Sequence, residues 1–196
     1  MVKDKMPKVS VIVPTIGRKS LKDTIQSILD QSYKNIEIIV TDDTNNENSY
    51  EIIKNFFLKD YLLKKIIFIK NYKYKKGPSG NKNNGLDIIS GDYFMFVDDD
   101  DIIYIDTIKI LVETALNKNY DIILGNYLSS NNQIVGVNYN KECAFSYEDI
   151  LSGKIDGEYT QLVKTAIIDN IKMNEDCWGA EHLFWWKLYK KVKNIY

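Results

Sequence analysis

The sequence predicts an α/β fold, with one open, mainly parallel sheet and helices packed on both of its faces. Over about the first two-thirds of the chain, short β-branched runs alternate with segments whose apolar residues recur at helical spacing. Such alternation is typical of βαβ units and of a parallel sheet. The chain has 196 residues, 44% of them hydrophobic and 27% charged, which suits a single globular domain with a real core.

The elements follow in order along the chain. Apolar runs predict strands at residues 9–13, 36–40, 65–69, 93–97 and 121–124. Helical spacing predicts helices at residues 21–29, 49–59, 80–90 and 106–117. After Gly125 the pattern loosens into turns, with one short strand near residues 134–137 and shorter helices. No repeat or linker divides the chain, so we predict a single domain over residues 1–196, with a less regular C-terminal third.

The composition excludes several classes of protein. Lys and Arg number 26 against 27 Asp and Glu, and Arg18 is the only arginine, so nucleic acid is not expected as a partner. No apolar run approaches the roughly 20 residues that span a bilayer, and we expect a cytoplasmic protein. Cys143 and Cys177 lack a CxxC or histidine context, which argues against a disulfide framework or a zinc site.

Polar segments follow three of the predicted strands. Residues 14–18 follow the first strand, Asp42 and Asp43 follow the second, and residues 98–101, all aspartate, follow the fourth. Ligands of open parallel sheets bind outside the carboxyl ends of the strands. We therefore expect the functional site along this edge.

The four aspartates at residues 98–101 predict a cation. They repel one another strongly if they are desolvated and unpaired, and Mg²⁺ or Mn²⁺ prefers oxygen ligands. A solvated turn that caps the next helix is the alternative, although one cap needs one aspartate. The glycine-rich segment 77–85 lacks the spacing of a P-loop, but Lys82 near a helix start suits an anionic ligand.

Five segments in this order carry a resemblance to a known family. They are Val9–Thr15, Glu37–Asp43, Asn83-x-Gly85, Gly91–Asp101 and Gly179–Trp186. Together they resemble the family 2 glycosyltransferases of the GT-A fold, a Rossmann-like architecture, from about Lys8 to Trp186. The resemblance implies an inverting transfer of sugar from a nucleoside-diphosphate sugar, usually a UDP-sugar, with Mn²⁺ or Mg²⁺. It further implies a hydroxyl acceptor on a glycan or lipid carrier, in the synthesis of a bacterial surface glycan.

Site residues carried over by the resemblance divide the chain in two. Residues 8–125 would bind the nucleotide sugar, and residues 126–196 would form the acceptor side and the C-terminal helix. The implied nucleotide-sugar contacts are Pro14, Thr15, Ile16, Arg18, Asp42, Asp43, Lys82, Asn83, Asp98 and Asp99. Asp100, assisted by Asp98, would bind the metal. Ile16 and Gly17 replace the Tyr-Asn pair that is frequent in the family, so we expect this segment to provide no aromatic stack on the nucleotide base.

Glu181 matches the general base of the family, which removes the proton of the acceptor hydroxyl. Glu175 and Asp176 are less favoured candidates for the same role. Ala180 stands where the family usually has an acidic neighbour of the base. We expect His182 either to assist the metal and diphosphate or to make only a hydrogen bond.

The aromatic segment around and after Glu181 has two interpretations. Trp178 suits an acceptor-sugar platform or a place in the core. Residues 183–196 mix apolar side chains with lysines, which is typical of a helix that contacts the inner face of a membrane. The favoured interpretation is a terminal helix that packs on the core through Phe184, Leu188, Val192 and Ile195.

Two other functions stay open at this point. One is a nucleotide-sugar-binding module of the same fold without catalytic activity. The other is a nucleotidyltransferase, which is disfavoured because no basic glycine-rich loop follows the first strand.

Overall fold

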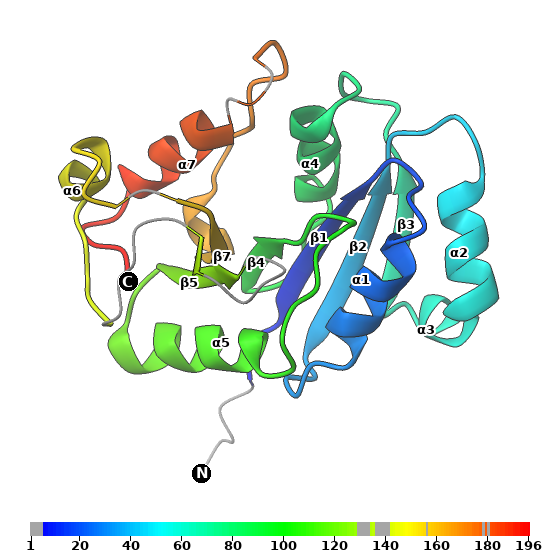
Figure 1. Cartoon of the computed structure of the whole chain (residues 1–196), viewed down its shortest axis with the longest axis horizontal. Helices are drawn as coiled ribbons and strands as arrows, with labels where there is room; N and C mark the ends of the chain where they lie inside the picture. The colour runs from blue at the N-terminus through cyan, green and yellow to red at the C-terminus, as the bar shows by residue number, and fades with distance from the viewer. Residues whose placement is uncertain (1–5, 129–133, 136–141, 156, 178, 180) are drawn as a thin grey trace.

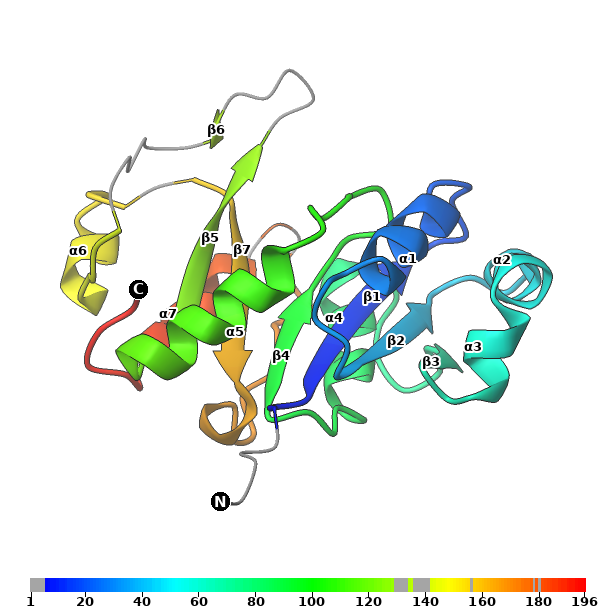
Figure 2. The ribbon, with the colours of Figure 1, turned by 90° about the horizontal axis from the view of Figure 1, so that it is seen from below.

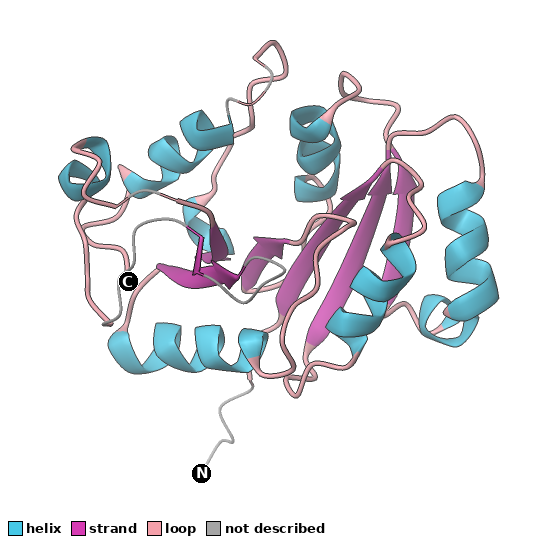
Figure 3. Cartoon of the chain, in the orientation of Figure 1, coloured by secondary structure: helices cyan, strands magenta, loops and turns pink. Residues whose placement is uncertain are grey.

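The computed structural model describes residues 6–128, 134–135, 142–155, 157–177, 179 and 181–196. They form a seven-stranded sheet with helices on both faces (Figure 1, Figure 3). The strands are β1 (Val9–Thr15), β2 (Ile36–Asp42), β3 (Ile66–Lys70), β4 (Tyr93–Phe96), β5 (Ile122–Leu128), β6 (Ile134–Val135) and β7 (Tyr159–Lys164). The helices are α1 (Leu21–Leu29), α2 (Asn48–Phe56), α3 (Leu58–Leu62), α4 (Pro78–Leu86), α5 (Thr107–Lys118), α6 (Tyr147–Leu151), α7 (Glu181–Tyr189) and the 3₁₀ turn η1 (Thr165–Ile167).

The strand order is β3-β2-β1-β4-β7-β5-β6. The first four strands in this order pair with one another in parallel, which confirms the predicted α/β class. An unpredicted strand, β7, lies between β4 and β5 and is antiparallel to both. Its sequence, Tyr-Thr-Gln-Leu-Val-Lys, contains only two adjacent aliphatic residues, which is too weak a pattern to predict a strand.

The two faces of the sheet bury different side chains of β1. Val9, Val11 and Val13 pack with residues of α1, α2 and α5, whereas Ile12 packs with residues of α4 and α7. Figure 2 shows α1 and α5 on one side of the sheet and α4 and α7 on the other. The alternation follows from the two-residue repeat of a strand, and the continuous apolar run follows from burial on both faces.

Two predicted helices have different limits in the structure. The helix expected at residues 49–59 is divided at Phe57, whose φ of −132° separates α2 from α3. The helix expected at residues 80–90 begins at Pro78 and ends at Leu86. Beyond it, the side chain of Asp87 pairs with lysines of other segments, and the backbone N–H of Ser90 donates to Glu37. These contacts hold residues 87–90 as a turn.

The C-terminal segment packs on the core, as the favoured interpretation predicts. Phe184, Leu188 and Ile195 are at most 1% exposed, and Val192 packs beside them. The helix itself is shorter than the pattern predicts, because α7 ends at Tyr189 and Ile195 pairs with Phe145 in an isolated bridge. None of the helices in the described ranges combines the length and apolar character needed to cross a bilayer.

Candidate active site

The carboxyl ends of β1 and β4 are joined through Asp99. This side chain is 2% exposed and accepts hydrogen bonds from the Thr15 hydroxyl at 2.6 Å and the Ile16 backbone N–H at 3.3 Å. A guanidinium nitrogen of Arg18 donates at 2.5 Å, and this hydrogen bond, with the charge of Asp99, raises the pKa of Arg18. Asp99 therefore fixes the loop that follows β1.

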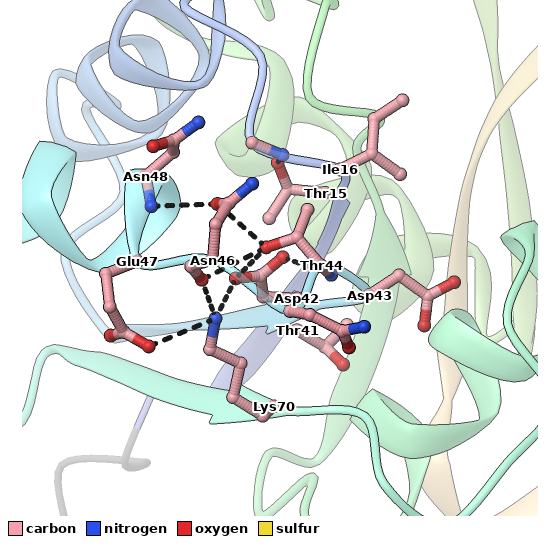
Figure 4. A network of polar contacts seen from close by, with 12 residues as sticks. Thr15, Ile16, Thr41, Asp42, Asp43, Thr44, Asn46, Glu47, Asn48 and Lys70 are labelled. Atoms are coloured by element: carbon pink, nitrogen blue, oxygen red, sulfur yellow. Dashed lines mark hydrogen bonds and ion pairs between the residues drawn. The ribbon is translucent and has the colours of Figure 1, made fainter.

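Asp42, at the end of β2, holds a second loop. Its side chain is 0% exposed and accepts hydrogen bonds from the Thr44 backbone N–H at 2.8 Å and from Lys70 Nζ at 2.9 Å (Figure 4). Burial alone lowers the pKa of Lys70, but the hydrogen bond and charge of Asp42 outweigh it, so the pKa is raised. The Asp42–Lys70 pair thus anchors the start of the loop between β2 and α2.

Asp43 points to a different side from Asp42 in Figure 4. Its two carboxylate oxygens accept from Asn71 Nδ2 at 2.7 Å and from the backbone N–H of Gly77 at 2.5 Å. The side chain therefore holds the segment that leads into α4. Both Asp42 and Asp43 lie on the predicted edge of the sheet, and both are engaged with the protein's own donors.

Lys82 brings the aspartate run and the predicted base together. Its ammonium lies 3.1 Å from Asp98 Oδ1 and 3.1 and 3.2 Å from the two carboxylate oxygens of Glu181. The Lys82 side chain is 6% exposed, compared with 50% for Asp98 and 34% for Glu181. Burial lowers the pKa of Lys82, but the charges of Asp98 and Glu181 more than compensate and raise it. One buried cation is thus shared by two carboxylates.

These three side chains line a cavity of about 300 Å³, here called the Glu181 cavity. His182 and Trp185 of α7 and residues 157–161, at and before the start of β7, complete much of its wall. The ring of His182 lies 4.9 Å from that of Trp186 in an edge-on contact. Residues of β7 were not identified from the sequence, because the strand itself was not predicted.

The polar helix α4 positions Lys82. The Asn81 side chain accepts a hydrogen bond from the Thr41 hydroxyl and donates one to the backbone carbonyl of Thr15. Asn84 donates to the Thr41 hydroxyl at 2.8 Å. Gly85 allows α4 to lie close against β1, because a Cβ at this position would be only 2.4 Å from a methyl carbon of Ile12. Sequence reasoning missed both asparagines, although a helix without an apolar stripe next to a sheet needs such partners.

Asn83 of α4 is bonded to the segment that precedes α7. Its side-chain amide donates to the Met173 carbonyl at 3.0 Å and accepts from the Met173 N–H at 2.8 Å. Nearby, Glu175 accepts from the Lys75 backbone N–H at 2.6 Å, and Asp176 forms an ion pair with the Lys75 side chain. Glu175 and Asp176, the less favoured base candidates, lie outside the lining of the Glu181 cavity.

The remaining residues that the sequence assigns to the site do not all lie in the Glu181 cavity or at the carboxyl ends of the strands. Pro14 is buried within β1, and Ile16 lies beyond its end with its side chain 56% exposed. Asn83 is 0% exposed and does not line the Glu181 cavity. Trp178 and Ala180 lie outside the described residues.

The aspartate run suits a divalent cation only in part. Within the described residues, no group of three or more His, Cys, Asp or Glu side chains is arranged to hold a metal. Asp98 and Asp100, with side chains 50% and 57% exposed, are the carboxylates open to an incoming ion. Because Mg²⁺ usually keeps waters and substrate phosphates in its shell, two protein carboxylates fit a cation that arrives with a diphosphate. Repulsion within the run does not require it, since Arg18 and Lys82 already pair with Asp99 and Asp98.

The comparison with protein families decides the classification. The profile of the family described as "Glycosyl transferase family 2" matches residues 10–183. The chain belongs to this family. A GalNAc(5)-diNAcBac-PP-undecaprenol beta-1,3-glucosyltransferase of Campylobacter jejuni is 36% identical to this family 2 chain, and the match covers 97% of the family 2 chain. The Escherichia coli glucosyltransferase WfgD, described as acting with UDP-Glc on alpha-D-GlcNAc-diphosphoundecaprenol, is 31% identical over 68% of the chain.

Solved structures share the fold. Staphylococcus aureus TarS, residues 1–349, crystallised with UDP-GlcNAc, superposes with a TM-score of 0.81 at 25% identity and matches 96% of the chain. The family 2 chain spans 62% of the Campylobacter protein, 54% of WfgD and 55% of the TarS chain. The GT-A fold implied by the sequence resemblance is therefore confirmed, and the relatives extend beyond the region matched here.

Proposed function

We propose that this chain transfers a sugar from a UDP-sugar to a hydroxyl group of a glycan or lipid-linked acceptor in bacterial surface glycan synthesis, with inversion at the anomeric carbon. The observation that carries the proposal is the Lys82 bridge. It connects Asp98 of the aspartate run to Glu181, so the donor edge and the base face one cavity. The support from relatives is the UDP-GlcNAc complex of TarS and the undecaprenol-linked acceptors named for two glucosyltransferases.

The donor would lie along the carboxyl ends of the parallel strands. Thr15 ends β1 there, Ile16 and Arg18 follow it, and Asp43 follows β2, around the space that the nucleotide would occupy. Lys82, and Arg18 at 47% side-chain exposure, supply positive charge for the diphosphate. A divalent cation held by Asp100 and Asp98 would neutralise the charge that grows on the leaving diphosphate.

Glu181 would accept the proton of the acceptor hydroxyl as its oxygen attacks the anomeric carbon. The new glycosidic C–O bond forms while the bond to the diphosphate oxygen breaks, and UDP departs with that electron pair. Attack from the side opposite the leaving group inverts the configuration. Lys82 orients the Glu181 carboxylate through both of its oxygens.

The test compares two glutamates of one segment. Release of UDP from UDP-glucose and UDP-GlcNAc, with Mn²⁺ and an acceptor panel, is measured for the wild type, Glu181→Gln and Glu175→Gln. We expect Glu181→Gln to lower turnover about 10³-fold, with the Kd for UDP changed less than twofold. Glu175→Gln, which removes a charge outside the cavity, should retain at least a third of the activity.

Two results would reverse these assignments. Full turnover by Glu181→Gln would remove the base from the mechanism. UDP binding without turnover by the wild-type protein would favour a nucleotide-sugar-binding module. Separately, Asp100→Ala with unchanged Mn²⁺-dependent UDP binding would show that the metal assignment is wrong.

A further inference from the structure

A second cavity adjoins the Glu181 cavity where the sheet opens. β4 pairs with β7 only at Tyr93–Lys164 and Phe94–Val163, whereas β7 stays paired with β5 as far as Tyr159–Asn126. Beyond Phe94 the two strands therefore separate. The space beyond that point, about 230 Å³, is lined by residues of β4, β7, β5 and the start of α5 and is here called the β4–β5 cavity.

The two cavities share part of their walls. Phe96, Asp101 and Thr160 line both, so the two form adjacent parts of one groove across the end of the sheet. Glu181 lies in one part, and Thr107 at the start of α5 lies in the other. A molecule seated in the β4–β5 cavity would thus lie next to the side that carries Glu181.

The lining of the β4–β5 cavity indicates the chemistry of its ligand. Among the described lining residues there is no lysine or arginine, and the one charged side chain is that of Asp101. A phosphate needs cationic partners, and two candidates lie elsewhere: Lys82 lines the Glu181 cavity, and Arg18 lies in the loop after β1, paired with Asp99. The hydroxyls of Thr107 and Thr160, the Asn126 amide and the apolar surface of Ile102 and Tyr104 suit an uncharged, hydroxylated ring.

We propose that the β4–β5 cavity is the acceptor subsite and that it binds a neutral pyranose of the acceptor glycan. This inference rests on the proposed function, because it takes the ring to be the one that presents its hydroxyl to Glu181. It also divides the substrates by charge. The diphosphate of the donor lies with Lys82 and Arg18, and the charged part of a lipid-linked acceptor stays outside the β4–β5 cavity.

The test measures binding rather than turnover. The probes are methyl glycosides of glucose, galactose, GlcNAc and GalNAc and the 6-phosphates of the same four sugars, followed by NMR titration of the protein. We expect at least one methyl glycoside to bind and its 6-phosphate to bind at least tenfold more weakly. Asn126→Ala and the isosteric Thr107→Val should each raise the glycoside Kd about 5- to 10-fold.

Matched controls place the same substitutions elsewhere. Asn55→Ala changes an exposed residue of α2, and Thr114→Val changes the outer part of α5; both should leave the glycoside Kd within twofold. Thermal melting shows whether each variant is folded, and Thr107→Val provides a second reading if Asn126→Ala is not.

The outcomes separate the two proposals. No glycoside binding at 50 mM, equal binding of the 6-phosphates, or unchanged Kd values for both folded variants would overturn the acceptor subsite. UDP binding with Mn²⁺ is measured on the wild type in parallel. Its absence would count against the proposed function, whereas UDP binding combined with unaffected variants would remove only the acceptor subsite.

Discussion

Asp99, at the carboxyl ends of the parallel strands, and Glu181 of α7 lie at the same end of the sheet, but the protein holds them in different ways. The Asp99 side chain is 2% exposed and accepts hydrogen bonds from Thr15 at the end of β1 and from Ile16 and Arg18 in the loop that follows, so the fold of the sheet itself determines its position. The Glu181 side chain is 34% exposed, and its position depends on α4, through Lys82 and through the Asn83–Met173 contact.

This difference indicates which residues should affect folding stability and which should affect turnover. Asp42, Asp43 and Asp99 are buried and each accepts two or three hydrogen bonds from the protein, so changing them should first affect folding. The contacts that α4 makes with Glu181 and Met173 join distant parts of the chain. If Glu181 is the base, as proposed, changing these contacts should affect turnover more than folding. The following predictions test that division, beginning with the largest expected effect.

Asp99→Ala should lower the free energy of unfolding by about 2–4 kcal/mol, because Thr15, Ile16 and Arg18 lose a shared acceptor. Urea unfolding measures the change. Asp100→Ala is the matched control: its side chain is 57% exposed and lies 3.6 Å from Arg18, so the loss should stay under about 0.5 kcal/mol. Equal losses for the two variants would show that the edge is not held by Asp99.

Lys82→Met should lower turnover about 100-fold, since Asp98 and Glu181 lose the cation that aligns them. The melting temperature should fall only modestly, because the two carboxylates that lose the cation, with side chains 50% and 34% exposed, remain accessible to water. Lys75→Met removes a surface ion pair with Asp176 and should change turnover less than threefold. Wild-type turnover by Lys82→Met would contradict the proposed role of Lys82 in aligning Asp98 and Glu181.

Asn83→Ala should lower kcat about tenfold and leave the Kd for UDP within twofold, because it frees the Met173 backbone before the base. Asn84→Ala, on the same helix, removes a contact to Thr41 and should reduce stability without that loss of kcat. A large rise in the UDP Kd of Asn83→Ala would instead support the nucleotide contact that the sequence predicts for this residue.

The smallest expected effect concerns Glu37, on β2 and away from the site. Burial raises its pKa, but the hydrogen bonds from Lys8, Ser10 and Ser90 outweigh it, and the pKa lies below its ordinary value of 4.5. The stabilisation is therefore present above pH 4.5 and is lost as the pH falls through the folded-state pKa. Glu37→Gln should cost about 1 kcal/mol near pH 7, and the gap should narrow below pH 4.5. A constant gap in urea unfolding from pH 7 to pH 3 would contradict this.

The parallel strands, and the polar residues at their carboxyl ends, were predictable because each is indicated by a short continuous stretch of sequence. The apolar run at Val9–Val13, for example, is followed at once by polar residues, so strand and edge come from one stretch of sequence. The family resemblance added Glu181, which is far along the chain from Asp98 and has no periodic relation to it.

What the sequence did not predict depends on contacts between distant segments. β7 is a strand because β4 and β5 flank it, and its own pattern is weak. The asparagines of α4 carry no signal until their partners, Thr41 and Met173, are placed beside them. The predicted cation was inferred partly from repulsion among the aspartates, and the pairing with Arg18 and Lys82 became visible only in the structure.

The most direct test of the central claim is the change in melting temperature caused by UDP with Mn²⁺. A ligand that binds only the folded state raises Tm, and the donor edge and the base should respond separately. We predict a rise of several degrees for the wild type at about 100 times the Kd, the same rise for Glu181→Gln, and none for Asp100→Ala. A rise that persists in Asp100→Ala and disappears in Glu181→Gln, or no rise in the wild type, would contradict the account.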